Sequence, residues 1–435
     1  MERFDLRPEI LDLVRKYWGE RPLEAFTPGE SHVSVSGKLI DSEDIVTLVE
    51  SCLDGWFTSG KYTDMFQKEL AKYIGVRNSL FVNSGSSANL LALTALTSKR
   101  LGKDKLEPGD EIITAATGFA TTLNPIIQNG LTPVIVDMEL NTLNVDVNQV
   151  QEAISPRTKG IMIAHTLGNP FALDEIVNLC NENNLWLIED NCDALGSKYK
   201  GKLTGSFGDL ATQSFYPAHH ITSGEGGAVL VNSPSLRKEI ESLRDWGRDC
   251  YCPSGVDNTC HKRFEWQLGS LPKGYDHKYI YSKIGYNFKA TEMQASLALS
   301  QLSKIEVFGE VRKNNFEFYK NKLSNLDSLT FVEATIDSSP SWFGFPIIVS
   351  QKARFSRNEI VGHLNSRNIG TRLLFAGNLT KQPAYEDVNF RKVSDLTVAD
   401  NLMNNAFWIG VQPNLSVDQM NYVAETIIAF VQQSE

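Results

Sequence analysis

Between residues 76 and 232, short apolar runs alternate with amphipathic segments along the chain. The apolar runs NSLFVNS, DEIITA, TPVIVDM, GIMIAHT and LWLIEDN have the length and composition of buried strands. The segments between them, such as SSANLLALTALTS and LDEIVNLCNENN, have the apolar spacing of helices. This alternation predicts an α/β fold with a mostly parallel sheet that is covered on both faces. Ligands of such sheets bind at the carboxyl ends of the strands, so the polar residues that follow each strand are the first candidates.

The pattern changes after the sheet region. Residues from about 232 to 285 show little periodicity, and a segment this long without structure of its own is more often functional than idle. A long helical pattern over 291–325 then leads into a smaller α/β region that contains WFGFPIIV. We therefore expect an N-terminal arm over 1–45, a large domain over 46–300, and a linking helix with a small C-terminal domain over 301–435.

Composition narrows the class of protein. The chain has 435 residues, of which 42% are hydrophobic and 22% are charged, as expected for a globular protein of two or more domains. No segment has the apolar length of a signal sequence or a membrane helix, so we expect a cytoplasmic protein without a membrane partner. A formal net charge of −10 argues against binding nucleic acid through bulk charge, although a local site can still hold a phosphate.

Three turns that follow predicted strands carry candidate residues. In NSGSSANLLAL, the backbone and hydroxyl groups of Gly85, Ser86 and Ser87 at a helix N-terminus could hold a phosphate or simply cap the helix. Asp190, at the end of LWLIED, could cap a loop or pair with a protonated ring nitrogen of a pyridinium cofactor. Phe119 follows another strand, where it is either a core aromatic or a ring that stacks on a flat cofactor.

Together these turns resemble the pyridoxal phosphate enzymes of aspartate aminotransferase fold, specifically the sugar aminotransferase and dehydratase family that acts on nucleotide-linked ketosugars. The resemblance covers nearly the whole chain from DGWFTSGKYTDMFQKEL onward. It implies that the turn at 84–88 holds the cofactor phosphate, that Asp190 pairs with the pyridine nitrogen and that Phe119 stacks on the ring. It also implies cofactor contacts for Ser214 and for Asn287, which would reach the phosphate of a neighbouring subunit in a homodimer.

The stretch SFYPAHHITSGEGGAV, residues 214–229, departs from the aminotransferase pattern. Family aminotransferases have a lysine where this chain has His219, and that lysine binds the cofactor covalently. An imidazole cannot form a stable Schiff base, but its pKa near neutrality suits a general base. His220 matches the next position of the pattern, and we expect it to have a structural role.

With a histidine at this position, the chain resembles the 3-dehydratases of 4-keto-6-deoxy nucleotide sugars. That resemblance implies pyridoxamine phosphate as the working cofactor and His219 as the base in loss of the C3 hydroxyl. Asp193 departs from the common family residue, and its role is left open. Arg372 is a candidate for the substrate phosphates, or else a surface or core-paired arginine.

Six cysteines are present, and Cys52 and Cys180 have the spacing of core residues in helices. The other four, Cys192, Cys250, Cys252 and Cys260, have a spacing typical of neither zinc fingers nor ferredoxins, so zinc, an iron–sulfur cluster and free thiols all remain open. With RDWGRDCYC, this set resembles the iron–sulfur members of the 3-dehydratase group. The resemblance implies a [2Fe-2S] cluster, a separate NADH-dependent flavin and iron–sulfur reductase, and a CDP-linked substrate used for 3,6-dideoxyhexose synthesis.

Two alternative functions stay open at this stage. One is a cluster-free 3-dehydratase that is coupled to glutamate. The other is a non-catalytic cofactor-binding sensor or scaffold that lost its lysine by decay. If the lysine had been lost by decay, the other residues of the family pattern should be lost as well. Four of them are in place: Asp190, Phe119, Ser214 and Asn287.

Overall fold

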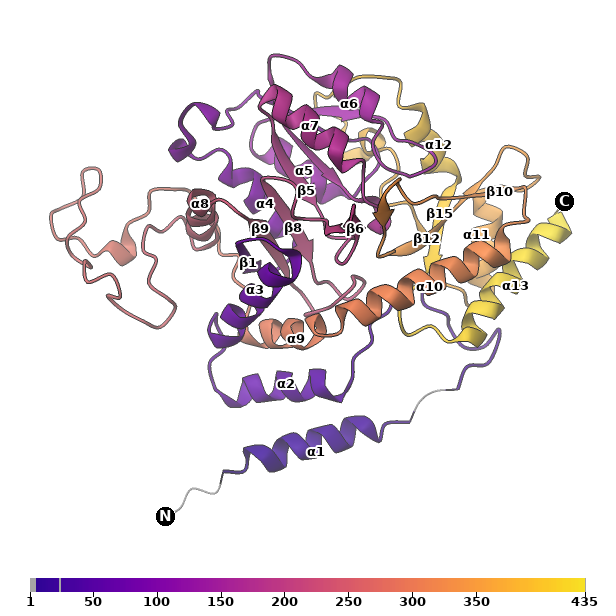
Figure 1. Cartoon of the computed structure of the whole chain (residues 1–435), viewed down its shortest axis with the longest axis horizontal. Helices are drawn as coiled ribbons and strands as arrows, with labels where there is room; N and C mark the ends of the chain where they lie inside the picture. Colours follow the sequence, from indigo (N-terminus) through magenta and orange to yellow (C-terminus); the bar gives the residue numbers. More distant parts are fainter. Residues whose placement is uncertain (1–4, 23–24, 435) are drawn as a thin grey trace.

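The computed structural model describes residues 5–22 and 25–434, and its centre is an eight-stranded sheet (Figure 1). The strand order is β1-β9-β8-β5-β4-β2-β3-β14. These strands are β1 (Asn78–Val82), β2 (Glu111–Ala115), β3 (Thr132–Val136), β4 (Thr158–Ala164), β5 (Trp186–Asp190), β8 (Leu210–Ser214), β9 (Gly227–Val231) and β14 (Arg391–Lys392). Only β9 runs antiparallel to its neighbours in this sheet, so the prediction of a mostly parallel sheet is confirmed.

Helices cover both faces of this sheet. They are α3 (Lys61–Ile74), α4 (Gly85–Ala95), α5 (Ala120–Gln128), α6 (Val147–Ala153), α7 (Leu173–Asn183), α8 (Pro234–Arg244) and α9 (Glu292–Leu302). The residues of β1 are apolar on both faces because helices cover both. Leu80 and Val82 pack in the core beneath α4, whereas Phe81 packs on the opposite face. There it meets Phe66 of α3 edge to face at 5.0 Å. Each such buried ring stabilises the fold by about 2 kcal/mol.

A second sheet lies at the C-terminal end of the chain. It is antiparallel, with the order β10-β12-β15-β13, and its strands are β10 (Leu329–Phe331), β12 (Gly344–Val349), β13 (Arg372–Leu373) and β15 (Ala406–Gly410). The accompanying helices are α10 (Ile305–Leu323), α11 (Arg357–Ser366), α12 (Thr397–Asn405) and α13 (Val417–Ser434). Strand β14 comes from this part of the chain but pairs with β3 in the large sheet. The domain division near residue 300 stays a prediction.

Shorter elements complete the described chain. A three-stranded sheet joins β6 (Lys198–Tyr199), β7 (Lys202–Leu203) and β11 (Ser338–Ser339), and so links the two regions. Helices α1 (Arg7–Gly19) and α2 (Ser42–Leu53) lie along the lower edge of the molecule in Figure 1. In the part of the chain that the structure describes, no helix is long and apolar enough to cross a membrane.

Three local predictions were wrong. The stretch 232–285 contains the helix α8, which Ser233 caps by accepting a hydrogen bond from the N–H of Leu236. The long pattern over 291–325 forms two helices, because the chain leaves regular helix geometry at Ser303 and Lys304. Cys52 is exposed, because α2 buries Asp44 and Ser51 instead; Cys180 is buried as expected.

Candidate active site

Several of the predicted residues meet at the carboxyl end of the large sheet. Asp190 ends β5, Ser214 ends β8, and Gly85 is the first residue of α4. The packing at Gly85 is tight: a Cβ placed there would lie 2.5 Å from Cβ of Ser214 and 3.2 Å from Sγ of Cys192. The N-terminus of α4 is therefore pressed against the loops that follow β5 and β8.

The N-terminus of α4 keeps free donors. Ser84 is the capping residue, and its Oγ accepts a hydrogen bond from the N–H of Ser87 at 3.0 Å. The Oγ of Ser86 contacts Oγ1 of Thr121 at 3.3 Å and is exposed. Because Ser84 satisfies only one of the first N–H groups of the helix, the remaining groups, with the hydroxyl of Ser86, can hold an anion. Capping and anion binding are thus both compatible with this turn.

Three donors orient the buried carboxylate of Asp190. Oδ2 accepts hydrogen bonds from Nδ2 of Asn89 at 2.8 Å and from Oγ1 of Thr122 at 2.7 Å. Oδ1 accepts one from the backbone N–H of Cys192 at 3.2 Å. Asn89 is held in turn by Oγ1 of Thr212 at 2.6 Å. These partners are absent from the residues predicted from sequence, although an asparagine on the apolar face of SSANLLAL is a signal that could have identified Asn89.

Glu189 has a different environment from its neighbour Asp190. Its carboxylate is buried and lies 3.1 Å from Nε2 of His165, and it accepts hydrogen bonds from the N–H groups of Gly205, Phe207 and Gly208. Burial by itself would raise the pKa of Glu189, but the hydrogen bonds outweigh it and the pKa is lowered. Glu189 thus anchors the loop after β7, and Asp190 is the member of the pair that faces the site.

His219 lies beside Asp193, with Nδ1 3.4 Å from a carboxylate oxygen. The two atoms are at ion-pair distance, but burial lowers the pKa of His219 to about 4. Burial and the nearby charge of Asp190 raise the pKa of Asp193 to about 8. At neutral pH both groups are therefore uncharged. His219 Nδ1 has no hydrogen-bond partner within the described residues, which leaves it available to another group.

The backbone of His219 is held by Arg312 of α10. This guanidinium is 1% exposed and donates to the main-chain oxygen of His219 at 3.4 Å and to those of Trp342 and Phe343. Burial lowers the pKa of Arg312 to about 10, so it remains a cation. Arg312 was not among the residues predicted from sequence, because nothing in the pattern of α10 marks the contact.

His220 contacts the small-domain backbone. Its Nε2 donates to the main-chain oxygen of Ser341 at 2.7 Å, and the side chain is 3% exposed. Burial also lowers the pKa of His220 well below its usual value, so the imidazole is neutral. These contacts agree with the structural role expected for this residue.

Three further candidates are exposed. Phe119 caps α5 and is 58% exposed, as a ring that stacks on a ligand would be. Asn287 is exposed on the segment that pairs with Asp245. Arg372 is also exposed and donates to the main-chain oxygen of its neighbour Thr371. Within residues 5–22 and 25–434, neither Asn287 nor Arg372 forms a hydrogen bond with the residues around Asp190.

The structure separates the four candidate cysteines into two places. Cys192 lies in the pocket beside Gly85, and burial raises its pKa well above the usual value. Cys250, Cys252 and Cys260 lie in the segment after α8, together with His277, a residue that the sequence analysis did not single out. Among the described residues, no contact joins Cys192 to the other three cysteines, and the four-cysteine ligand set stays a prediction.

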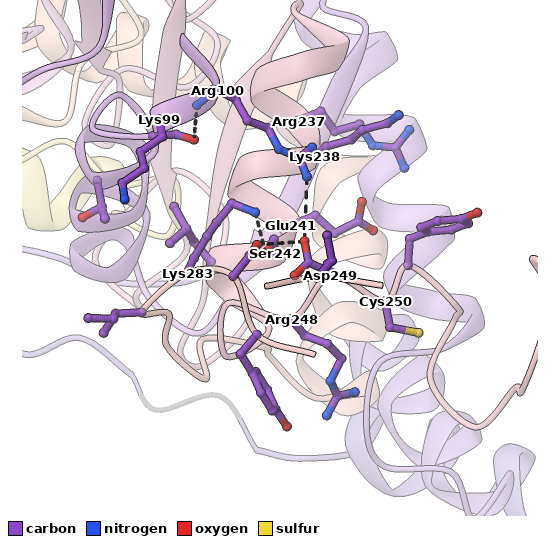
Figure 2. Close-up of a pocket in the computed structure, with 18 of the residues that line it drawn as sticks. Lys99, Arg100, Arg237, Lys238, Glu241, Ser242, Arg248, Asp249, Cys250 and Lys283 are labelled. Carbon is purple, nitrogen blue, oxygen red and sulfur yellow. Dashed lines mark hydrogen bonds and ion pairs between the residues drawn. The ribbon is translucent and has the colours of Figure 1, made fainter. Parts of the chain in front are cut away.

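Figure 2 shows a broad pocket beside this second group, with a volume of about 1510 Å³. Cys250 lies on its wall, and basic side chains outnumber the acidic ones, Glu241 and Asp249. The basic residues of this pocket are Arg77, Lys99, Arg100, Arg237, Lys238, Arg248 and Lys283. Arg100 and Lys283 pair with Glu239, so the remaining positive charge is less than the count suggests. We call this region the basic pocket.

Comparisons with known proteins show the family of the chain. The sequence profile of the DegT/DnrJ/EryC1/StrS aminotransferase family matches residues 38–428. A protein of Saccharopolyspora spinosa named dTDP-4-dehydro-2,6-dideoxy-D-glucose 3-dehydratase is 53% identical over 99% of this chain and 93% of its own length. The lipopolysaccharide biosynthesis protein RfbH of Salmonella typhimurium is 53% identical over 98% of both chains.

A solved structure confirms the expected fold. It is that of Escherichia coli GDP-4-keto-6-deoxy-D-mannose-3-dehydratase with bound hydrated PLP. It superposes with a TM-score of 0.82 at 28% identity, covering 91% of this chain and 99% of the other. The aspartate aminotransferase-like architecture expected from the sequence is thus confirmed.

Proposed function

The chain belongs to the DegT/DnrJ/EryC1/StrS aminotransferase family, and from that premise we propose that it is a nucleotide-sugar 3-dehydratase that uses pyridoxamine phosphate. The observation that carries the proposal is His219, which stands where aminotransferases of the family have their lysine. His219 lies beside Asp193, and its imidazole is neutral because burial lowers its pKa. A neutral imidazole can move protons but cannot hold the cofactor covalently.

The residues around Asp190 fit the cofactor. The N-terminus of α4 at Gly85, Ser86 and Ser87 provides donors for its phosphate, and a side chain at Gly85 would collide with Ser214. Asp190 is already oriented to accept a hydrogen bond from a pyridine nitrogen, and Phe119 is exposed for stacking. When bound, pyridoxamine phosphate supplies an amine for a sugar ketone and a ring that acts as an electron sink.

His219 is the general base in this proposal. Its pKa of about 4 keeps an imidazole nitrogen unprotonated at neutral pH, so it can accept a proton without first losing one. Arg312 holds the main-chain oxygen of His219 and fixes the approach of the ring. Asp193, uncharged near neutrality, can donate a hydrogen bond to the sugar hydroxyl that leaves.

We further propose that the enzyme receives single electrons through a [2Fe-2S] cluster from a separate NADH-dependent flavin and iron–sulfur reductase. The thiols of Cys250, Cys252 and Cys260, gathered outside the cofactor pocket, support this part of the proposal. The basic pocket beside Cys250 favours a partner with an acidic docking surface. The exposure of Asn287 fits a homodimer in which it reaches the phosphate site of the other subunit.

CDP-4-keto-6-deoxy-D-glucose is the proposed substrate, in 3,6-dideoxyhexose synthesis for O-antigen. The name of the RfbH relative supports a polysaccharide role, whereas other relatives are named for dTDP- and GDP-linked sugars. The test is to offer CDP-, dTDP- and GDP-linked 4-keto-6-deoxyhexoses with pyridoxamine phosphate and a reducing system. We expect loss of one water per sugar, fastest with CDP. Transfer of an amino group to C4 without loss of water would contradict the dehydratase proposal.

A cluster-free dehydratase that is coupled to glutamate is the second candidate. The similarity to a solved GDP-4-keto-6-deoxymannose-3-dehydratase with a trapped PLP-glutamate geminal diamine favours it. It predicts that dehydration continues with glutamate after iron is removed and that no reductase is needed. If no 4-keto sugar is converted although the cofactor binds, the non-catalytic alternative applies instead.

A further inference from the structure

We propose that Trp56 is a positioning residue for electron transfer. Its indole packs against Gly255 and so fixes the direction in which the cysteine-bearing segment, residues 250–279, projects from the rest of the chain. The role in electron transfer rests on the proposed function, whereas the packing of Trp56 rests on contacts within one chain.

The cysteine-bearing segment is tied together by its own side chains. Arg263 pairs with Asp276 at 2.7 Å and with Asp257 at 3.3 Å. The rings of Trp266 and His277 lie edge to face, with centroids 4.4 Å apart. The segment is therefore a small unit of its own, and in Figure 1 it extends away from the large sheet beside α8.

This unit is fastened at its base, where its two ends meet. The N–H of Asp249 donates to the main-chain oxygen of Ile280 at 3.0 Å, and Oγ of Ser282 donates to Asp249 at 2.8 Å. The two chain ends also approach closely, because a Cβ on Gly285 would lie 2.1 Å from the backbone nitrogen of Gly247. A unit that is fastened at one place can turn about it, so a contact elsewhere is needed to fix its direction.

Trp56 supplies such a contact. It lies in the loop between α2 and α3, and its indole lies between two glycines. A Cβ on Gly255 would lie 2.5 Å from Cη2 of Trp56, and a Cβ on Gly60 would lie 2.8 Å from Cδ1. Gly255 also has a φ of 74°, which favours glycine. A larger residue at position 255 would therefore push the segment away from the ring.

The loop that carries Trp56 is itself held in place. Nε1 of Trp56 donates to the main-chain oxygen of Ser59 at 3.1 Å. Glu292, the first residue of α9, has a buried carboxylate that accepts a hydrogen bond from the N–H of Gly60 at 2.7 Å. The loop is thus fixed on α9, and Trp56 gives Gly255 a fixed surface to pack against.

The direction of the segment matters for the proposed reductive step. In that step NADH and one proton replace the C3 hydroxyl of the sugar by hydrogen and release NAD⁺ and water, so two electrons must reach the cofactor site. They would pass through the cluster that the cysteines hold. Transfer depends on the separation and orientation of the reacting groups, so a segment that turns about its base should deliver electrons more slowly. Loss of water, which uses His219, should continue.

Hydrogen–deuterium exchange and reduction kinetics on full-length protein, reconstituted with iron and sulfide, test this role. In Trp56→Ala, amides within 250–279 should exchange about fivefold faster or more. Electron transfer per bound iron should be about tenfold slower, with the rate of water loss within about twofold of wild type. Dithionite serves as the electron donor, and recovery of cluster absorbance after mixing with the 4-keto sugar measures the transfer. Trp56→Phe, which keeps an aromatic ring, should fall between the two.

Phe57→Ala is the matched control, because Phe57 lies in the same loop and its ring is 53% exposed. The segment should exchange in this variant as it does in wild type. A double-mutant cycle then separates the contact from general destabilisation. Gly255→Ala should speed up exchange of the segment in wild type but add much less in Trp56→Ala, because the colliding ring is absent.

Two outcomes would overturn the proposal. One is unchanged exchange of the segment in Trp56→Ala, and the other is faster exchange with electron transfer at the wild-type rate. A wild type that removes water from the sugar but holds no iron would overturn the electron-transfer role together with the reductive part of the proposed function. In that case faster exchange in Trp56→Ala would still support the packing of Trp56 against the segment.

Discussion

Nδ1 of His219 lies 3.4 Å from a carboxylate oxygen of Asp193, and burial keeps both groups uncharged at neutral pH. An ion pair here would hold His219 protonated and prevent it from accepting a proton. The desolvated pair instead leaves the imidazole free as a base and the carboxyl group able to donate a hydrogen bond. The relationship gives His219 and Asp193 separate, testable roles.

Replacing His219 by asparagine removes the proposed base. We expect the rate of dehydration to fall by about 10²- to 10⁴-fold while the cofactor still binds, because the asparagine side chain fills a similar space. Single-turnover kinetics with the 4-keto sugar measure this loss. His220→Gln is the control: it should lower the melting temperature, since His220 bonds to the backbone of Ser341, but keep most of the chemistry. Full activity in His219→Asn would refute the assignment.

Asp193 should make stability depend on pH. The pKa of Asp193 is raised to about 8, so between about pH 4 and 8 the folded chain holds a proton that the unfolded chain has released. The contribution of this group to stability is therefore present at low pH and lost as pH rises through about 8. Between pH 5 and pH 8, the free energy of unfolding of wild type should fall by about 1 to 3 kcal/mol more than that of Asp193→Asn. Urea unfolding of cofactor-free protein at several pH values measures the difference. An equal dependence of the free energy of unfolding on pH in both proteins would contradict the prediction.

The donors to Asp190 should matter for cofactor affinity. Asn89→Ala removes one of the two hydrogen bonds to Oδ2 and the link to Thr212, so we expect pyridoxamine phosphate to bind about 5- to 100-fold more weakly. Fluorescence or absorbance titration measures the affinity. Asn148→Ala, on the exposed end of α6, should leave it unchanged. If Asn89→Ala bound pyridoxamine phosphate as tightly as wild type, the hydrogen bond from Asn89 to Asp190 would not contribute to cofactor binding.

The contact between Gly85 and Ser214 predicts a rescue. Gly85→Ala places Cβ 2.5 Å from Cβ of Ser214, so the α4 terminus must shift and phosphate affinity should fall. The double variant Gly85→Ala/Ser214→Gly should regain part of that affinity, because the two Ser214 atoms within 3 Å of the new Cβ are gone and only Sγ of Cys192, at 3.2 Å, remains close. Inorganic phosphate competition against the cofactor gives the measurement. Gly362→Ala, where no atom lies within 4 Å, should bind as wild type does.

The basic pocket should influence electron supply. Replacing Arg237 and Lys238 by glutamate reverses charge on its rim and should slow reduction by an acidic donor about tenfold at low salt, with a smaller effect at high salt. Stopped-flow reduction at two ionic strengths tests this. Lys313→Glu/Lys322→Glu on α10 changes the net charge equally and serves as the control. An equal loss in both variants would mean that only net charge matters.

The site could be predicted only in part. The turn at Gly85 and the acid at Asp190 were recognisable because polar residues after buried strands meet at one edge of a parallel sheet. Asn89, Thr122 and Arg312 were missed, because each reaches the site from a helix face where its neighbours are apolar. Hydrophobic periodicity assigns such positions to the core and does not reveal which polar group they meet.

By itself, the sequence determined the strand and helix order, the parallel sheet and the histidine in place of a lysine. These depend on local periodicity and residue type. Only the tertiary structure decided that Cys52 is exposed, that Cys192 lies beside Gly85 and that His277 contacts Cys250 and Cys260. The physical reason is that these outcomes depend on contacts between residues far apart in the chain, which packing selects and spacing along the sequence does not encode.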